Sequence, residues 1–263
     1  MPSINLRLLM EPDTVQLEIT NEQCNTIKEK VKFLQNTLSE IDYCLMLREN
    51  IQEAFGDFKT NGAGIDNNFI RLNRYLMNWL NSFYAWIEHH ERHYKELFSS
   101  LKSYYYDSYF SYRFAYEMRK YTTHQSLCIS RIIYDVLNES TKYIIPIDEI
   151  LTHGREIKSS LRQELTQMKT NGTEIDLVRF TKEFLAMFES FQNELWKRII
   201  PKSDEKCHDL MVYIEPYLDK PITGYRIKEN DIITINVGVT LNRYTEKKKC
   251  LESPEVLMRY LSE

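Results

Sequence analysis

Long stretches of this sequence repeat apolar residues at alternating steps of three and four, which is the spacing of one buried face of an α-helix. One stretch begins near Asn21 and ends near Gly56. Another ends at Pro201, and its apolar members are Leu177, Phe180, Phe184, Leu185, Phe188, Phe191, Leu195 and Ile199. Helices of this length bury their apolar faces only against other elements, so we expect a bundle of long helices.

The same spacing predicts further helices between and beyond these two stretches. They are expected at residues 66–97, 104–123, 130–143, 155–169 and 203–216, with a short helix at 254–261. The glycine-containing loop at 59–64 predicts that the first two helices form an antiparallel hairpin. Thr173 and Asp176 predict the start of the helix that Pro201 should stop, because proline has no backbone N–H to continue it.

Both ends of the chain contain short apolar-alternating runs that are typical of β-strands. The runs at 4–10 and 14–19 flank the turn-forming residues Glu11-Pro12-Asp13, and those at 225–227 and 232–241 flank residues 229–231. We therefore expect a hairpin near each end, and the two hairpins are able to pair into one small sheet. The predicted fold class is mainly α, an antiparallel helical bundle with short β-hairpins near the N- and C-termini.

Charge and cysteine content restrict the cellular setting. The chain has 34 Lys and Arg against 38 Asp and Glu, a net charge of −4, which argues against binding nucleic acid or membranes through its overall field. Its 5 cysteines are odd in number and scattered, as expected of free thiols in a reducing compartment. No signal peptide and no apolar stretch of about 18 residues is visible, so we expect a cytoplasmic protein without a membrane partner.

Common catalytic and cofactor motifs are absent from the sequence. It contains no nucleophile elbow, no phosphate-binding glycine loop and no dinucleotide fingerprint, so no cofactor is expected. His89 and His93 have the i, i+4 spacing of helical metal ligands, but the pattern H-E-x-x-H is not formed. We interpret this segment as a polar helix face and predict no metal site.

The segment 104–121 is rich in tyrosine. Tyr105, Tyr109, Tyr112 and Tyr116 recur at helical spacing, which favours a buried stripe over a surface that stacks on unpaired bases. Near the end of this segment, Arg119 precedes His124 by five positions. A pair with this spacing is expected by chance in a chain of this composition, so the spacing alone carries no weight.

The surroundings of this pair add weight. The run Tyr112-Arg113-Phe114-Ala115-Tyr116-Glu117-Met118-Arg119-Lys120-Tyr121-Thr122-Thr123-His124 resembles the motif region of HEPN proteins, the higher eukaryotes and prokaryotes nucleotide-binding family. In that family an aromatic-rich helix leads into Arg, a polar residue, three further residues and His. The resemblance divides the chain into an N-terminal hairpin at 1–20, a HEPN-like helical bundle at 21–145, and additional helices with the C-terminal hairpin and short helix at 146–263.

The resemblance implies a metal-independent RNA endonuclease that works as a homodimer and uses the 2′-hydroxyl of the RNA as nucleophile. His124 would transfer protons, because imidazole titrates near neutral pH. Arg119 would hold the scissile phosphate with its fork of N–H donors. Lys120, Tyr116 and Tyr121 are the expected substrate-binding residues. By analogy with the family, a role as a toxin or a defence or stress protein is expected, with an antitoxin or regulatory protein as partner.

Two features keep alternatives open. Active members commonly have Asn, Asp or His at the position of Lys120, so the chain is alternatively a catalytically inactive helical dimer that binds RNA or a protein. Five residues along an ideal helix turn through about 140°, so Arg119 and His124 diverge unless the helix ends near Thr122-Thr123. A third possibility is an unrelated helical scaffold in which the Arg–His pair is accidental.

Overall fold

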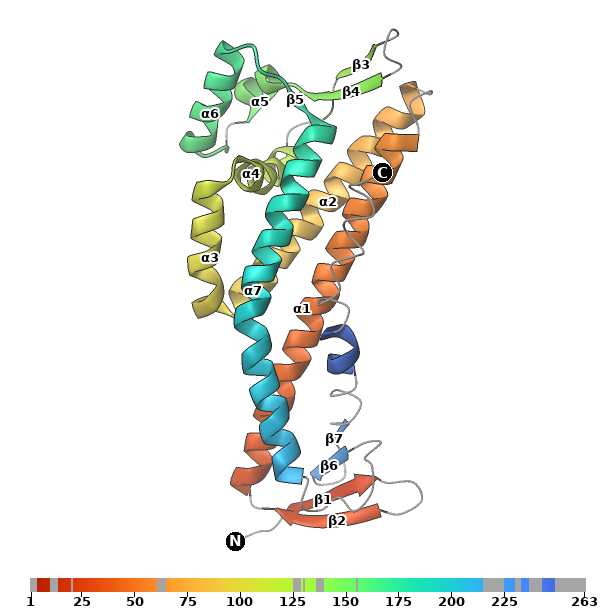
Figure 1. Ribbon diagram of the computed structural model, residues 1–263, viewed down its shortest axis with the longest axis vertical. Coiled ribbons are helices and arrows are strands. Elements are labelled where there is room, and N and C mark those ends of the chain that lie inside the picture. Colours follow the sequence, from red (N-terminus) through yellow and green to blue (C-terminus); the bar gives the residue numbers. More distant parts are fainter. Residues whose placement is uncertain are drawn as a thin grey trace. The chain divides into compact units, whose positions relative to one another are not determined.

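A computed structural model of the 263-residue chain describes residues 4–9, 14–19, 21–60, 65–124, 129, 131–135, 140–154, 156–214, 225–229, 233–236 and 243–248. The described residues are mostly helical, with short antiparallel strands, which confirms the predicted fold class. Figure 1 labels the elements. The chain divides into two compact units: unit 1 takes its residues from Met1–Asp42 and Trp196–Arg259, and unit 2 from Tyr43–Leu195 and Tyr260–Glu263.

Unit 1 contains a four-stranded sheet and parts of two helices. Its strands are β1 (Ile4–Leu9), β2 (Thr14–Ile19), β6 (Tyr225–Glu229) and β7 (Ile233–Asn236), in the order β2-β1-β6-β7. All neighbours are antiparallel, with Ile4 opposite Ile19 and Leu6 opposite Ile227. Both predicted hairpins are therefore confirmed, and they form one sheet (Figure 1).

The helical part of unit 1 is the beginning of α1 (Asn21–Thr60) and the end of α7 (Leu177–Ile214). Its apolar residues at helical spacing are buried: Ile27, Val31, Leu34, Leu38 and Ile41 from α1, with Trp196, Ile199 and Leu210 from α7. Two hydroxyl groups join the helices inside this unit, because the oxygens of Thr37 and Ser203 lie 3.3 Å apart. Residues 243–248 are helical, and their Tyr244 is buried.

Unit 2 contains the remaining helices and a three-stranded sheet. The helices are the rest of α1 and α7, α2 (Ile65–His93), α3 (Lys95–Ser108), α4 (Phe110–His124), α5 (Ile147–His153) and α6 (Ser159–Thr170). The sheet has the order β3-β4-β5, formed by Arg131–Asp135, Ser140–Ile145 and Ile175–Asp176. α4 packs against both α2 and α3.

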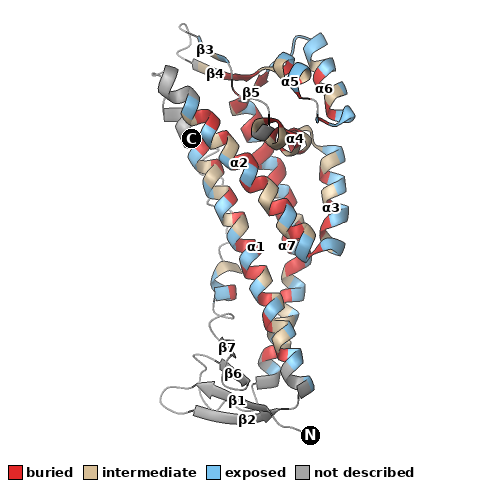
Figure 2. Ribbon diagram, turned by 180° about the vertical axis from the view of Figure 1, so that it is seen from behind, coloured by how far each residue is buried: buried red, intermediate tan, exposed pale blue. Residues whose placement is uncertain are grey.

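Aromatic rings fill the core of unit 2. The fully buried ones are Trp79, Phe83, Trp86, Phe98, Tyr105, Tyr112, Tyr121, Tyr143, Phe114, Phe184 and Phe191. Phe83 of α2 is central, because its ring lies 4.9 Å from that of Phe184 and 5.3 Å from that of Tyr112. Figure 2 shows buried residues along α2 and α7. The predicted burial of the tyrosine stripe is confirmed for Tyr105 and Tyr112.

Several predicted helix boundaries were wrong. The helix expected at 66–97 ends at His93, and the one expected at 104–123 consists of α3 and α4. The breaks are single residues: Tyr94 has φ −133° and ψ 38°, and Tyr109 is extended. Aromatic residues recur on both sides of each break, so the periodicity continues while the chain changes direction.

The prediction of a helix at 130–143 was also wrong, because Arg131–Asp135 form β3 and Ser140–Ile145 form β4. The strands contain several isoleucines, a threonine and two tyrosines, which favour a pleated, half-buried surface. β4 also pairs with β5, which brings Ile145 opposite Ile175. A two-residue partner strand distant in the sequence leaves no local signal.

Proline residues act differently from the prediction. α7 continues through Pro201, which lies inside the helix. Its missing N–H removes a backbone hydrogen bond, which costs about 3 kcal/mol in a helix interior. The helix expected at 155–169 corresponds to α6, whereas α5, which follows Pro146, was not predicted.

The helix that was expected to start at Thr173 begins at Leu177. Asp176 caps it, since its Oδ1 accepts hydrogen bonds from the backbone N–H groups of Val178 and Arg179. Of the strand expected at 232–241, the structure describes Ile233–Asn236, which form β7, and the other residues lie outside the described ranges. The helix expected at 254–261 lies outside the described residues.

Candidate functional site

The candidate site is the end of α4, and the burial pattern of this helix decides which side chains face outward. Phe114, Ala115, Met118 and Tyr121 recur at steps of three and four and are all buried. Tyr121 is only 2% exposed, so the structure places this predicted substrate-binding residue in the core. Tyr116, Arg119 and Lys120 are half-buried and lie at the surface of unit 2.

Arg119 lies against an aromatic ring from another helix. Its guanidinium carbon is 4.1 Å from the ring centroid of Tyr84 in α2, a cation–π contact. This contact places a permanent positive charge beside a tyrosine face. Arginine at such a position is able to bind a phosphate oxygen and to stack on a planar group.

Lys120 lies beside Tyr116 and a buried carboxylate. Its Nζ is 5.9 Å from the ring centroid of Tyr116 and 3.8 Å from Oε2 of Glu117. Glu117 has no exposed surface, and its Oε1 also accepts a 3.5 Å hydrogen bond from the Tyr106 hydroxyl. The structure therefore brings Tyr116, Arg119 and Lys120 together on one surface, with a carboxylate beneath them.

His124 is the last residue of α4, and its side chain lies outside the described residues. The helix does not end at Thr122-Thr123, and the Thr122 hydroxyl donates a 3.0 Å hydrogen bond to the carbonyl of Arg119. Because α4 continues to His124, the backbone positions of Arg119 and His124 lie about 140° apart around the helix axis. The expected helix end that would bring these two residues together within one chain is absent from α4.

Three half-buried tyrosines surround this surface and keep their protons. Burial raises the pKa of Tyr84, and a hydrogen bond to Glu88 raises it further. Burial is also the largest cause of the raised pKa of Tyr116 and of Tyr106, and nearby carboxylates add to it. These phenols therefore remain uncharged near neutral pH, as a surface that approaches phosphate requires.

The histidine segment of α2 is packed rather than open. Burial lowers the pKa of His89 to about 4, with added effects from His93 and Arg92. The rings of His89 and His93 are 4.5 Å apart, and Tyr43 stacks on His89 at 4.8 Å. His90 is fully buried, so the predicted polar face does not include it. Within the described ranges, no group of three or more His, Cys, Asp or Glu could hold a metal ion.

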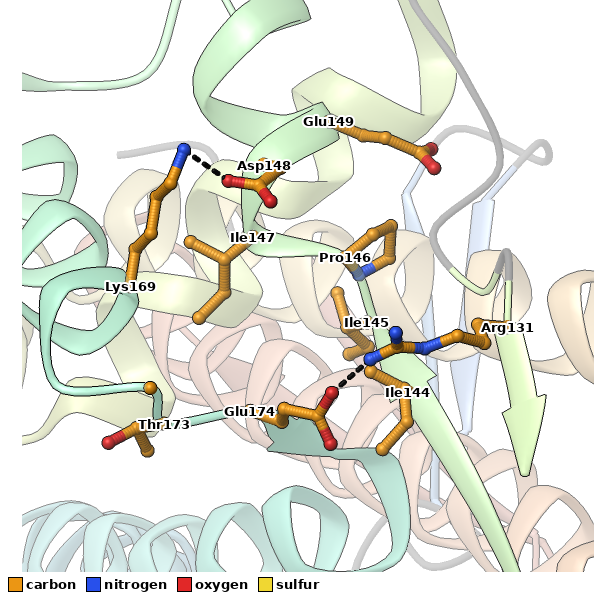
Figure 3. A pocket seen from close by; sticks show the side chains of 11 residues that line it. Arg131, Ile144, Ile145, Pro146, Ile147, Asp148, Glu149, Lys169, Thr173 and Glu174 are labelled. Atoms are coloured by element: carbon orange, nitrogen blue, oxygen red, sulfur yellow. Dashed lines mark hydrogen bonds and ion pairs between the residues drawn. The ribbon is translucent and has the colours of Figure 1, made fainter. Parts of the chain in front are cut away.

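A pocket of about 510 Å³ in unit 2 is a second candidate. Its floor contains Ile145, Pro146 and Ile147, and two ion pairs flank it, Arg131–Glu174 and Lys169–Asp148. Figure 3 shows the apolar side chains between the two ion pairs. In this conformation the cations of both pairs are held by carboxylates.

Sequence reasoning missed the residues that other helices bring to the α4 surface. Tyr84 comes from α2, Lys102 and Tyr106 from α3, and Lys158 precedes α6. Nothing local marks them as neighbours of Tyr116, because their proximity depends on how α2, α3, α4 and α6 pack. The aromatic richness of 104–121 was the available signal.

Comparisons with known proteins identify no relative: no family model, no curated protein and no solved structure matches the chain. A search of the helices in the described part of the chain finds none with the length and apolarity needed to cross a bilayer. The function proposed below therefore rests on the residues of this chain alone.

Proposed function

We propose that this chain is a metal-independent RNA endonuclease of the HEPN type that acts as a homodimer in the cytoplasm. Support comes from the motif at the end of α4 and from the position of the half-buried Arg119 at the surface of unit 2. The reaction requires one group that binds the scissile phosphate and one that moves protons. Arg119 supplies the first role, and His124 the second, first as base toward the 2′-hydroxyl and then as acid toward the leaving oxygen.

The observation that carries the dimeric form of the proposal is the continuity of α4 through His124. Within one chain the two positions lie on different sides of the helix, which favours a site shared between two copies over a site within one copy. Two copies related by a twofold axis would each supply what the other needs, since such an interface repeats every contact twice. Each site would combine Arg119 of one copy with His124 of its partner.

A subunit-mixing experiment tests this arrangement. Arg119→Ala and His124→Ala chains carrying different affinity tags are co-expressed, and the mixed dimer is isolated by two purification steps. It contains one intact site, so we expect roughly half of the wild-type RNA cleavage, with a chelator present, while each homodimeric variant is inactive. Wild-type protein that cleaves no single-stranded or structured RNA would contradict the nuclease proposal. An inactive mixed dimer beside an active wild type would contradict the shared site.

Lys120 favours a second candidate, a catalytically inactive dimer that binds RNA or a regulatory protein. Lys120 occupies the position at which active HEPN members commonly have Asn, Asp or His. Its ammonium group lies beside the carboxylate of Glu117. This candidate predicts that wild-type protein binds RNA without cutting it. Cleavage gained by Lys120→Asn would show that the rest of the site is competent, whereas continued inactivity would favour the binding role.

A further inference from the structure

Three tyrosines from three helices form a continuous surface in unit 2, which we call the tyrosine surface: Tyr84 of α2, Tyr116 of α4 and Tyr106 of α3. The ring centroids of Tyr84 and Tyr116 are 5.7 Å apart, and those of Tyr116 and Tyr106 are 6.2 Å apart. All three side chains are half-buried, so each ring is fixed by packing while part of it remains accessible. Tyr112, fully buried, contacts the rings of Tyr106 and Tyr116.

Four cationic side chains accompany the three rings. Arg119 lies 4.1 Å from the ring centroid of Tyr84, and Lys158 lies 4.4 Å from that of Tyr106. Lys102 and Lys120 lie 5.4 Å and 5.9 Å from the ring centroid of Tyr116. These cations lie over the rings, so a base that stacks on a ring takes the place of a cation, which then turns to the adjoining phosphate. Aromatic rings and cations in one surface are the combination that binds single-stranded nucleic acid.

Carboxylates limit the charge of this surface without removing it. Glu91 forms a 2.5 Å ion pair with Lys102, and Glu88 accepts a hydrogen bond from the Tyr84 hydroxyl. Glu117 is buried beneath Lys120 and Tyr106. Because these anions oppose phosphate binding, we expect moderate affinity in which base stacking contributes a large share.

We infer that the tyrosine surface binds unpaired nucleotides of a single RNA strand and guides them toward Arg119 at the end of α4. The choice of RNA rests on the proposed function, whereas stacking on the rings does not depend on cleavage. A duplex keeps its bases stacked on one another, so its base faces are not available to these tyrosines. The surface therefore selects unpaired segments.

The test measures binding of a fluorescently labelled 12-nucleotide RNA without secondary structure to full-length protein carrying His124→Ala, which prevents cleavage. In that background, Tyr84→Leu and Tyr116→Leu remove a ring but keep apolar volume. We expect each to weaken binding by about 5- to 100-fold, the range for loss of one stacked base. Tyr116→Phe retains the ring and should bind within about twofold of the parent. Tyr134→Leu, at an exposed tyrosine of β3, is the matched control and should bind like the parent.

A second variant tests the surface in the opposite direction. Glu91→Gln removes the carboxylate that holds Lys102, so we expect binding to tighten by a few-fold at low salt. The DNA oligonucleotide of the same sequence should also bind, because every base has a stacking face, and duplex RNA should bind at least about tenfold more weakly. Equal binding of duplex and single strand, or leucine variants that bind like the parent while circular dichroism shows normal helix content, would overturn the inference.

These outcomes separate the inference from the proposed function. Ring-dependent binding by a wild-type protein that cuts no RNA would support the tyrosine surface and refute the nuclease. Cleavage by wild type together with unchanged binding by both leucine variants would support the nuclease and refute the tyrosine surface.

Discussion

The two units are stabilised by different kinds of contact. In unit 2, rings from α2, α3, α4 and α7 meet in one cluster, with Phe83 of α2 within 5.9 Å of the ring centroids of Tyr112, Phe184 and Phe188. In the helical part of unit 1, the buried apolar residues of α1 are aliphatic, and polar contacts join α1 to α7: Thr37 to Ser203 and Lys30 to Asp209. A ring cluster concentrates stability in a few large side chains, whereas an aliphatic helix pair distributes it.

The ring cluster also explains why the candidate surface lies in unit 2. Tyrosines at the edge of an aromatic core bury one part of the ring and keep the other part accessible. Tyr112 and Tyr116 show this transition, since they lie on the same helix, their rings are stacked at 12°, and only Tyr112 is fully buried. The aromatic core and the candidate surface are therefore continuous at the contact between Tyr112 and Tyr116.

The largest expected effect is on the ring cluster itself. Phe83→Ala should lower the free energy of unfolding by about 3–5 kcal/mol, because it removes a ring from the centre of tightly packed neighbours and leaves a cavity. Urea unfolding followed by tryptophan fluorescence measures it, since Trp79 and Trp86 both lie in this core. Phe83→Leu, which retains most of the volume, should lose less. A loss below about 1.5 kcal/mol for the alanine variant would show that the cluster is not the main support of unit 2.

A second effect depends on a histidine inside that cluster. His90 donates from Nδ1 to the carbonyl of Trp86 at 2.8 Å, and burial lowers its pKa to about 3. Its folded pKa lies below the unfolded value near 6.5, so its contribution is complete above pH 6.5 and is lost as the pH falls. Over this acidic range the loss is about 1.4 kcal/mol per pH unit.

His90→Phe keeps an aromatic ring next to Trp86 and Phe98 but cannot titrate. The unfolding free energy of wild type, measured from pH 7 to 4.5, should therefore decrease relative to that of His90→Phe as the pH falls. His89 and the carboxylates are present in both proteins, so the difference isolates His90. The exposed His153 supplies the matched control His153→Gln, which should run parallel to wild type. Parallel curves for His90→Phe would mean that His90 is not held neutral by the core.

Some parts of the structure could be predicted from the sequence because their signals are local. Glu11-Pro12-Asp13 between two alternating runs predicted the first hairpin, and the spacing of Leu177 to Ile199 predicted most of α7. Segment 130–143 was mistaken for a helix because short apolar runs fit either structure. Tyr94 and Tyr109 broke the helices without glycine or proline, so no local signal marked them.

The candidate site was predictable only in part for the same reason. Arg119, Lys120 and Tyr116 belong to one helix, and its sequence was sufficient to group them. The helical spacing of Phe114, Met118 and Tyr121 was also sufficient to place Tyr121 in the core. Tyr84 and Tyr106 reach the surface from α2 and α3, so finding them requires the packing of three helices.

A smaller effect is expected in unit 1. Thr37 and Ser203 are buried, and their hydroxyls also bond to the carbonyls of Phe33 and Ile199 in their own helices. Thr37→Val preserves shape and Ser203→Ala removes one oxygen, so each should cost about 1 kcal/mol of unfolding free energy. A double-mutant cycle measures the contact between helices, with an expected coupling of roughly 0.5–1.5 kcal/mol. A coupling of zero would show that the contact between these two hydroxyls does not help to hold α1 and α7 together.

The smallest effect is expected at the pocket of unit 2. Arg131 and Glu174 form an ion pair in which both side chains are at least half exposed, so water screens the charges and ordering the side chains offsets the attraction. Arg131→Gln, Glu174→Gln and their combination should give a coupling below about 1 kcal/mol, which added salt reduces further. The pair spans β4, the middle strand of the sheet. Arg131 lies in β3, opposite Ile144 of β4, and Glu174 immediately precedes β5 on the other side of β4. A coupling above about 2 kcal/mol that persists in salt would show that this sheet depends on its ion pair, and that unit 2 is not supported by aromatic packing alone.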